Sequence, residues 1–400
     1  MMQPRLQIDC DFPGGNIVVE DIAGATVRLH QDLRDTRQDW FYWCFRVRGA
    51  AGRTVQFVFT KSRALGVRGP AVSRDQGGTW QWLGAAAVQD NAFAYAFAAQ
   101  DTDVRFSFGM PYQASHWQRF VSILPATPHF ALQPLCTTAK GRAVEYAVLG
   151  CLQHAPAYCV ALACRHHCCE MMASYALEGL IAWVVQDANA GATWLRDNVQ
   201  FLCVPFVDLD GVEDGDQGKG RHPRDHGRDY AGVSIHAATA ALRALLPAWS
   251  AGRLHVAIDL HCPWIAGEHN EALYLVGAEE PRAARAQRRF SAILEAIQTG
   301  PLHFSAADYL PFGCAWNTNT NTTGGQGFAR WARTLPGIDL GTALEIPYAN
   351  ARGAEVNQIS ARLFGRDLAA AIAAYLKESA GDNHDQGHHA PLFSPSVISV

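Results

Sequence analysis

The chain has 400 residues and a formal net charge of −4 at neutral pH, with 49% hydrophobic and 18% charged residues. This length suits about two domains of ~100–200 residues each, and the apolar fraction excludes a globally disordered protein. Proteins that bind nucleic acid usually carry a basic face or stripe, and because no long run of one charge sign is present, we expect no nucleic-acid partner.

The N-terminal residues and the cysteines indicate a cytoplasmic protein without a membrane partner. Met1–Phe12 lacks the apolar core of a signal peptide, and no apolar stretch reaches the ~18 residues that span a bilayer. The 11 cysteines are odd in number and scattered through apolar segments such as Tyr158–Cys164, which favours reduced thiols over a disulfide framework. The sequence does not indicate an oligomeric state.

Residues 1–109 show the pattern of an all-β sandwich domain. Short apolar or alternating runs recur between Gly-containing turns, at a spacing typical of sandwiches. The aromatic run Trp40–Trp43 has two interpretations, a ligand-binding stripe and packing in the core on alternating faces, and we favour the second. The expected strands are Trp40–Val47, Thr54–Thr60, Trp80–Leu83, Ala92–Ala98 and Val104–Phe108.

From Met110 the pattern changes to strands that alternate with helices, and we predict an α/β domain over residues 110–378. Alternation of this kind indicates a largely parallel or mixed sheet flanked by helices. The expected strands are Val144–Leu149, Tyr158–Cys164, Val199–Val207, Leu254–Leu260, Leu273–Val276 and Gly341–Ile346. The expected helices are Ser115–Leu124, capped by Ser115, and Met171–Val185, Ser234–Leu246, Pro281–Ile297 and Val356–Leu376.

Two further segments are predicted to lack regular structure. Asn317–Gly327 is rich in Asn, Thr and Gly and is expected to form an irregular loop. Residues 379–400 are polar and contain His384, His388 and His389. We predict a mobile tail there, although a His-rich end can also bind metal weakly.

Candidate ligands fall where predicted strands end. A turn with His167 and Glu170 follows one strand, and His261 and Glu345 end two others. Open α/β sheets build their sites just outside the carboxyl ends of strands. Two imidazoles and one carboxylate, with a fourth position left for water, make up a hydrolytic zinc site, and a further Glu can take the proton of the water. The sequence therefore predicts zinc on His167, Glu170 and His261, with Glu345 as general base.

These residues also have ordinary interpretations. A His-x-x-Glu pair often arises by chance at the start of a solvated helix, and the combination at three strand ends is what favours a site. Cys164, Cys168 and Cys169 with His166 offer a structural zinc knuckle as an alternative. Such knuckles usually show a C-x-x-C pair with a distant partner pair, which is missing here. We favour Cys168 and Cys169 as small filler residues in the ligand turn.

Taken together, the motifs resemble the zinc metallocarboxypeptidase family, and within it the cytosolic carboxypeptidase-like branch, which also carries a β-sandwich before the catalytic domain. The matching stretches stand in family order and cover about Met110 to Leu376. They are RHHCCEMMA at Arg165–Ala173, EG at Glu178 and Gly179, VPFVDLDG at Val204–Gly211, GKGRHPRDHGRDY at Gly218–Tyr230, DLHCPW at Asp259–Trp264 and TALEIPY at Thr342–Tyr348.

The resemblance implies the same zinc ligands and the same base, which also passes a proton to the leaving amine. It further implies that Asp225 accepts a hydrogen bond from His167 and fixes its tautomer. Arg228 would pair with the terminal carboxylate of the substrate, and Arg221 would stabilise the oxyanion of the tetrahedral intermediate. The alternative for both arginines is ordinary surface charge.

The chain departs from the family pattern in three places. The usual Pro-Gly between the zinc-binding His and Glu is Cys168-Cys169, and the Asn that helps to anchor the carboxylate is Gly227. The loop from Arg221 to Gly227 is also short. These changes leave metal binding and hydrolysis in place and put strict recognition of a free C-terminus in doubt.

The expected function is zinc-dependent removal of a C-terminal residue from a peptide or protein. One rival is a deacylase or amidohydrolase that cleaves a small acylated amino acid with the same zinc triad, although that branch does not begin with a sandwich. A second rival is a non-catalytic binding protein on a peptidase scaffold, and the retained ligands and base argue against it.

Substrate choice is expected to depend on the segment Gly324–Trp331. Arg330 is its first cation and precedes Glu345 by fifteen positions. An arginine in the pocket would favour an acidic C-terminal residue, because a carboxylate partner removes the cost of an uncompensated charge. Two alternatives stay open: a slip in the alignment would put Phe328 in the pocket and favour apolar residues, or Arg330 lies exposed on a solvated loop.

Overall fold

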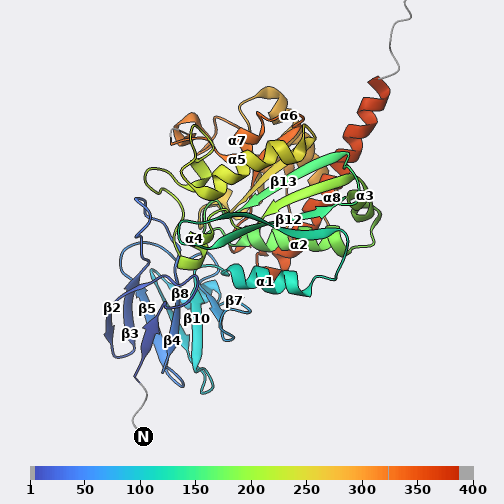
Figure 1. Ribbon diagram of the computed structural model, residues 1–400. Coiled ribbons are helices and arrows are strands. Elements are labelled where there is room, and N and C mark those ends of the chain that lie inside the picture. The colour runs from blue at the N-terminus through green and yellow to red at the C-terminus, as the bar shows by residue number, and fades with distance from the viewer. Residues whose placement is uncertain (1–4, 323, 387–400) are drawn as a thin grey trace, which may run out of the picture.

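The computed structural model describes residues 5–322 and 324–386, and its N-terminal part consists of two five-stranded sheets (Figure 1). The strand orders are β1-β4-β10-β6-β7 and β2-β3-β5-β9-β8, and neighbours are antiparallel except for the parallel pair β3 and β5. The strands are β1 (Gln7–Asp9), β2 (Val18–Ala23), β3 (Thr26–His30), β4 (Cys44–Arg48), β5 (Thr54–Phe59), β6 (Ala71–Ser73), β7 (Gln81–Trp82), β8 (Val88–Gln89), β9 (Ala92–Ala96) and β10 (Asp103–Ser107).

Aromatic side chains fill the space between these two sheets. Phe45 on β4 lies 5.3 Å from Phe57 on β5, and Phe106 on β10 lies 5.4 Å from Phe93 on β9, measured between ring centroids. Rings that interdigitate from two facing sheets form the core of a sandwich, so the predicted architecture is confirmed. All four residues of Trp40–Trp43 are buried, as the core interpretation predicts, although the strand itself starts only at Cys44.

The following part of the chain forms a mixed sheet of seven strands among the described residues, in the order β11-β12-β14-β13-β15-β17-β16. The four central strands, β14, β13, β15 and β17, are parallel, and the flanking strands pair antiparallel. Apolar runs such as that of β13 are typical of parallel strands covered on both faces. The strands are β11 (Phe130–Thr137), β12 (Ala143–Gly150), β13 (Tyr158–Cys164), β14 (Val199–Val204), β15 (Leu254–His261), β16 (Tyr274–Val276) and β17 (Leu340–Glu345), with a separate hairpin of β18 (Asn350–Ala351) and β19 (Ala354–Glu355).

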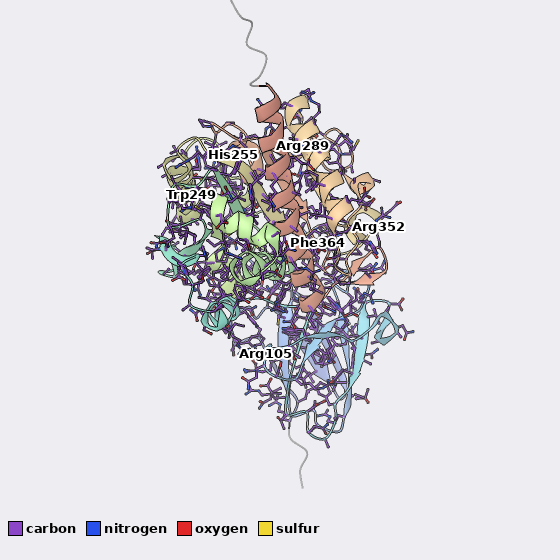
Figure 2. All side chains as sticks on the ribbon, turned by 90° about the vertical axis from the view of Figure 1, so that its right-hand side faces the viewer. Arg105, Trp249, His255, Arg289, Arg352 and Phe364 are labelled. Carbon is purple, nitrogen blue, oxygen red and sulfur yellow. The ribbon has the colours of Figure 1, made fainter. Side chains whose placement is uncertain are left out.

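Helices cover both faces of this sheet: in Figure 1, α1 and α2 lie below it and α5 and α7 above it. The apolar helix α2 packs against α8, which also contacts α6, and Figure 2 shows Phe364 on α8, a fully buried residue. The helices are α1 (Ala114–Ile123), α2 (Met172–Gln186), α3 (Ala190–Asn198), α4 (Leu209–Asp214), α5 (Ala237–Ser250), α6 (Pro281–Ile297), α7 (Phe328–Ala332) and α8 (Gln358–Gln386). Short 3-10 helices are η1 (Ala85–Ala87), η2 (His226–Arg228), η3 (Glu268–Glu271), η4 (Ala306–Asp308) and η5 (Asn319–Thr322).

The predicted fold class is confirmed, with local differences. Ser115 does not cap α1, because the helix already starts at Ala114 and Gln113 is its N-cap. The predicted tail begins inside α8, which continues through residues 379–386, and positions 387–400, including His388 and His389, lie outside the described residues. The boundary near residue 110 stays a prediction. No helix within 5–322 and 324–386 is long and apolar enough to cross a membrane, and the 11 cysteines are free thiols.

The sandwich is joined to the α/β part through the segment that follows α4. The Gln217 side chain accepts a hydrogen bond from Tyr42 N at 2.7 Å and donates one to Tyr42 O at 2.9 Å. Asn16 Nδ2 donates to Gly215 O at 2.7 Å. Gln217 and Asn16 are both fully buried, so each needs the hydrogen bonds that the other part of the chain provides. The same segment leads into the candidate site.

Candidate metal centre

Neighbouring strands of the central sheet bring the predicted ligands together at one edge. β15 and β17 are parallel, and their register places His261 opposite Glu345. β13 pairs with the other side of β15, and the turn after β13 carries His167 and Glu170. Ligand atoms of His167, Glu170 and His261 all lie within 4.8 Å of one another. The convergence expected from the strand ends is therefore present.

The three side chains present a donor set that suits zinc. Nδ1 of His167 lies 2.8 Å from Oε1 of Glu170, and Nδ1 of His261 lies 2.7 Å from its Oε2. All three residues are buried. Although burial alone would raise the pKa of Glu170, the two imidazoles hold that pKa well below its ordinary value. Two imidazole nitrogens and an ionised carboxylate directed at one point are the ligands of a typical hydrolytic zinc site.

The other nitrogen of each imidazole faces a carboxylate. Nε2 of His261 lies 2.9 Å from Oδ2 of Asp259, and Nε2 of His167 lies 3.7 Å from Oδ1 of Asp225. A carboxylate behind a metal-binding histidine fixes its tautomer and leaves the opposite nitrogen free for the metal. Asp225 was predicted and Asp259 was missed. Its signal is its position two residues before His261 on one strand, which directs both side chains to the same face of the sheet.

His166, Asp259 and His261 form a second group of candidate ligands. However, Nδ1 of His166 lies 2.7 Å from Asp259 Oδ1, and its Nε2 lies 2.7 Å from the hydroxyl of Tyr230. Both ring nitrogens of His166 are thus engaged and neither is left for a metal ion. His166 instead holds Asp259 in place beside His261. No cysteine belongs to a candidate metal group in the described part of the chain, and Cys168 Sγ donates to Asp216 O at 3.0 Å. The zinc-knuckle alternative therefore has no geometric support.

Glu345 lies in the wall of the cavity that contains His167 and His261. It is 7% exposed, and its Oε2 has no hydrogen-bond partner. Burial raises the pKa of Glu345 to about 7, while His261 opposes this shift and Glu170 reinforces it. A carboxylate with a free oxygen and a pKa near neutrality has the properties of a general base.

The turn between β13 and α2 is held by Arg165, whose backbone is in the left-handed region with φ of 62°. Its guanidinium is buried and donates to Cys168 O from Nε at 2.8 Å, with a further bond from Nη2. Nη1 donates to Tyr112 O at 2.9 Å and to Ser174 Oγ at 3.2 Å. An unfavourable backbone conformation persists only where its surroundings determine it, and here it fixes the turn that presents His167 and Glu170.

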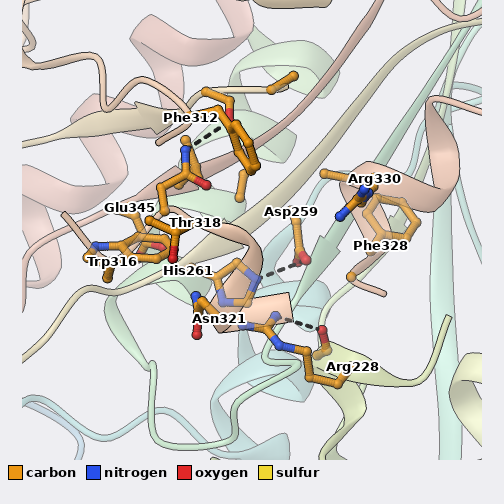
Figure 3. Close-up of a pocket in the computed structure, with 18 of the residues that line it drawn as sticks. Arg228, Asp259, His261, Phe312, Trp316, Thr318, Asn321, Phe328, Arg330 and Glu345 are labelled. Atoms are coloured by element: carbon orange, nitrogen blue, oxygen red, sulfur yellow. Dashed lines mark hydrogen bonds and ion pairs between the residues drawn. The ribbon is translucent and has the colours of Figure 1, made fainter. Parts of the chain in front are cut away.

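Arg228 lines the same cavity from η2 (Figure 3). Its Nη1 donates to Gly227 O at 3.2 Å, and none of the ion pairs among the described residues involves Arg228. Gly227 itself is required by the close approach of His167, because a Cβ at this position would lie 2.6 Å from His167 Nε2. The structure thus gives a reason for the glycine that replaces the Asn of the family pattern.

Arg330 also lines this cavity, from α7 (Figure 3). Its Nη2 lies 3.5 Å from Oε2 of Glu279, and the two side chains are 39% and 48% exposed. Arg333, one helical turn later, lines the cavity as well and was missed, although an i, i+3 spacing of two arginines is a readable signal. Phe328 is buried and contributes to the same wall. Arg330 and Phe328 therefore both reach the cavity.

Arg221 does not lie in this cavity. Its Nε lies 2.9 Å from Asp35, its Nη1 2.6 Å from Asp208 and its Nη2 3.0 Å from Asp216. Burial would lower the pKa of Arg221, but Asp208 and Asp35 raise it above its ordinary value. The guanidinium is 15% exposed and lines a separate cavity with His226. Of the residues predicted from the sequence, Arg221 is the one that the structure separates from the others.

No family model matches the chain. An uncharacterized protein of Zymomonas mobilis is 24% identical over 215 residues, or 52% of this chain and 54% of that protein, so the chain spans about half the length of the curated relative it matches.

Solved structures match over much more of the chain. A metallo-carboxypeptidase from Burkholderia cenocepacia is 19% identical, with a TM-score of 0.76 over 94% of this chain and 99% of that one. A Pseudomonas aeruginosa metallo-carboxypeptidase in complex with (2-guanidinoethylmercapto)succinic acid has a TM-score of 0.73 at 19% identity, over 93% and 99%.

The fold is that of the metallo-carboxypeptidases. Carboxypeptidase A of Helicoverpa armigera is 13% identical and matches only 68% of this chain and 74% of its own, with a TM-score of 0.51. The bacterial enzymes thus share nearly the whole two-part architecture, and the insect enzyme shares a smaller part of it. The cytosolic carboxypeptidase-like branch stays a prediction.

Proposed function

We propose that this chain is a zinc-dependent metallo-carboxypeptidase that removes a C-terminal residue from peptides or proteins. The observation that carries the proposal is the pair of imidazole Nδ1 atoms that converge on Glu170, with Glu345 in the same cavity. Zinc bound by this set would lower the pKa of a water molecule and polarise the carbonyl of the scissile bond.

The protein side chains account for the proton transfers of such a hydrolysis. Glu345 takes a proton from the water molecule as the water oxygen adds to the carbonyl carbon. The π electron pair of the carbonyl then moves onto the carbonyl oxygen. The pair returns as the C–N bond breaks, and Glu345 passes the proton to the leaving nitrogen. Asp259, whose Oδ2 lies 2.9 Å from Nε2 of His261, keeps His261 in the tautomer that exposes Nδ1. Asp225 faces Nε2 of His167 at 3.7 Å, which is too long for a hydrogen bond.

Arg228 supports exopeptidase action on a free C-terminus. It is a cation in the cavity wall without a carboxylate partner among the described residues. A guanidinium binds a terminal carboxylate through two parallel hydrogen bonds, which would place the last peptide bond next to the metal ligands. Gly227 has no donor side chain. Arg228 would therefore contribute a larger share of carboxylate binding than an arginine that acts together with a neighbouring Asn.

The experiment combines metal content with turnover. Purified wild type should contain one zinc ion per chain and release C-terminal residues from a diverse peptide library. His167→Ala and His261→Ala should contain far less zinc, because each loses one of three ligands. Glu345→Gln should keep its zinc while turnover falls by about 10²-fold or more. Full zinc occupancy in both histidine variants would refute the assignment of this site.

The same experiment tests the rivals. Stoichiometric zinc without turnover on any peptide would indicate a binding protein on a peptidase scaffold. Activity on small acylated amino acids, with none on peptides, would indicate a deacylase.

We further propose that the released residue is acidic. Arg330 and Arg333 place two guanidinium groups in the cavity wall, and the partners of both, Glu279 and Glu280, are about half exposed. Exposed ion pairs are weak, so a substrate carboxylate can replace Glu279 at little cost. Nε of Arg333 has no hydrogen-bond partner and is buried. The carboxylate of an acidic substrate side chain would compensate the positive charge of these guanidinium groups.

A further inference from the structure

The separation of Arg221 from the cavity leaves the developing oxyanion without its expected partner. Each of the three guanidinium nitrogens of Arg221 already engages a different carboxylate. A cation compensated in this way in a buried site is held there by its partners, and moving it would leave several carboxylates uncompensated. Zinc bound at the site would polarise the carbonyl, and a side-chain donor to the oxyanion would have to come from another cation of the cavity.

Lys219 lies two residues before Arg221 and does line the cavity, together with His167, His261 and Glu345. It also lines the adjoining cavity that extends to Trp40, Trp264 and Glu345. Lys219 is half-buried, and no ion pair or hydrogen bond involves its ammonium group in the part of the chain that the structure describes. Among the cations of the segment Gly218–Arg221, it is the one free to meet a substrate.

The Lys219 ammonium is positioned by an aromatic ring of the sandwich. Its Nζ lies 5.3 Å from the centroid of the Trp40 ring, a distance typical of a cation–π contact. The indole of Trp40 is itself fixed, because its Nε1 donates to Cys169 Sγ at 3.2 Å in the turn of the metal ligands. The Trp40 ring therefore contacts both Lys219 and the turn that carries His167 and Glu170, and it holds the two at a fixed separation.

The backbone around Lys219 is held on both sides. Gly218 has φ of 75°, its N donates to Asp35 Oδ2 at 2.8 Å, and a Cβ there would lie 2.4 Å from Cys168 N. On the other side, Gly220 N donates to Asp225 Oδ2 at 2.9 Å. Oδ1 of the same carboxylate lies 3.7 Å from Nε2 of His167, so Asp225 lies between the metal ligand and the turn that carries Lys219.

From this geometry we infer that Lys219, and not Arg221, stabilises the oxyanion of the tetrahedral intermediate. The inference rests on the proposed function. As the water oxygen adds to the carbonyl carbon, the π electron pair moves onto the carbonyl oxygen, and the Lys219 ammonium donates a hydrogen bond to it without transferring a proton. The pair returns when the C–N bond breaks. Trp40, Asp35 and Asp225 act as positioning residues for Lys219.

The test compares Lys219→Met, Lys219→Arg and Arg221→Met, each loaded with zinc. Removing one oxyanion donor typically lowers kcat by about 10²–10³-fold, so Lys219→Met should lose this factor while KM changes by no more than about threefold. Lys219→Arg should recover most of the loss, because it restores a charged donor. Zinc content should stay at the wild-type level in both Lys219 variants.

A binding measurement provides a readout that does not depend on turnover. A phosphonate peptide analogue carries a tetrahedral, charged phosphorus group, and groups that act in the transition state bind such analogues more tightly than substrate. Calorimetry should show weaker phosphonate binding by Lys219→Met, by about the factor lost in kcat, with the affinity for a product amino acid unchanged.

The outcomes separate this inference from the proposed function. A wild type that hydrolyses no substrate overturns both. An active wild type with unchanged kcat and unchanged phosphonate affinity in Lys219→Met overturns the role of Lys219 alone. A rise in KM at constant kcat also overturns it, because Lys219 would then bind the ground state of the substrate. Arg221→Met that stays folded and loses phosphonate affinity, beside Lys219→Met that keeps it, would return the role to Arg221.

Discussion

Glu170 and Glu345 are two buried carboxylates in one small region whose surroundings shift their pKa values in opposite directions. The imidazoles of His167 and His261 hold the pKa of Glu170 well below its ordinary value, against the effect of burial. Burial raises the pKa of Glu345 to about 7, and its Oε2 has no partner. Environments that separate two carboxylates in this way assign them different roles, here a charged ligand and a base that exchanges protons.

A pH profile of kcat/KM tests the role of Glu345. A base must be deprotonated to act, so activity falls as the pH drops below its pKa. Because burial raises this pKa, we expect the midpoint of the acidic limb above the ordinary glutamate value of 4.5, and bound zinc draws it below about 7. Circular dichroism over the same pH range controls for unfolding. A midpoint at or below 4.5 would contradict the assignment.

Arg330 is the residue at which substrate choice can be measured. We expect kcat/KM to be higher for a peptide ending in Glu than for peptides ending in Phe or Lys, because the carboxylate replaces Glu279 as the partner of Arg330. Arg330→Ala should lose most of this preference. The matched control is Arg285→Ala, an arginine of α6 outside the cavity lining, which should keep it. A wild type without preference for Glu would exclude acidic specificity, and Phe328 would then be the residue to examine.

At the scale of elements, the strand ends could be read from the sequence and the turns between them could not. β15 and β17 end in a polar residue and a polar turn follows the apolar β13, and parallel pairing made the convergence of His261 and Glu345 predictable. Elements with a mixed or short pattern were not predicted: the strands β1, β2, β3, β6, β8, β11, β18 and β19, and the helices α3, α4 and α7. Arg221 lies outside the cavity while Lys219, two residues before it, lines the cavity, and no spacing rule reveals this arrangement of the turn that starts at the left-handed Gly218.

The turn after β13 offers a test at this scale. Arg165→Met removes charged hydrogen bonds to the backbone of the ligand turn, each worth about 1.5–3 kcal/mol. We expect a lower Tm and zinc affinity weaker by about 10–100-fold, because His167 and Glu170 lose their fixed positions. The matched control is Arg196→Met, which removes bonds to Val184 O and Asp187 O away from the site. It should lower the Tm alone, and equal loss of zinc affinity in both variants would contradict the role of the turn.

At the scale of the whole molecule, a comparison of variants at Trp40 and Trp43 distinguishes an effect on stability from an effect on catalysis. Trp40→Leu removes the ring beside Lys219, and Trp43→Leu removes a fully buried ring whose Nε1 donates to Ala64 O. Both should lower the Tm, because each leaves a cavity in the core. A cation–π contact of about 1 kcal/mol corresponds to about a fivefold effect, so only Trp40→Leu should lower kcat per zinc-loaded, folded molecule. Equal kcat in both variants would contradict a catalytic contribution from the sandwich.

The contacts of Gln217 and Asn16 have a consequence for anyone who shortens or recombines this chain. A fragment that starts at Met110 keeps every metal ligand, yet it strips the buried Gln217 amide of both bonds to Tyr42 and takes Trp40 away from Lys219. Grafting the metal-binding half onto another protein would meet the same difficulty. Gln38, Asp39 and Trp40 line the cavity that adjoins the metal ligands and reaches Glu345, so deleting the first hundred residues would change the surroundings of Lys219 as well as the fold.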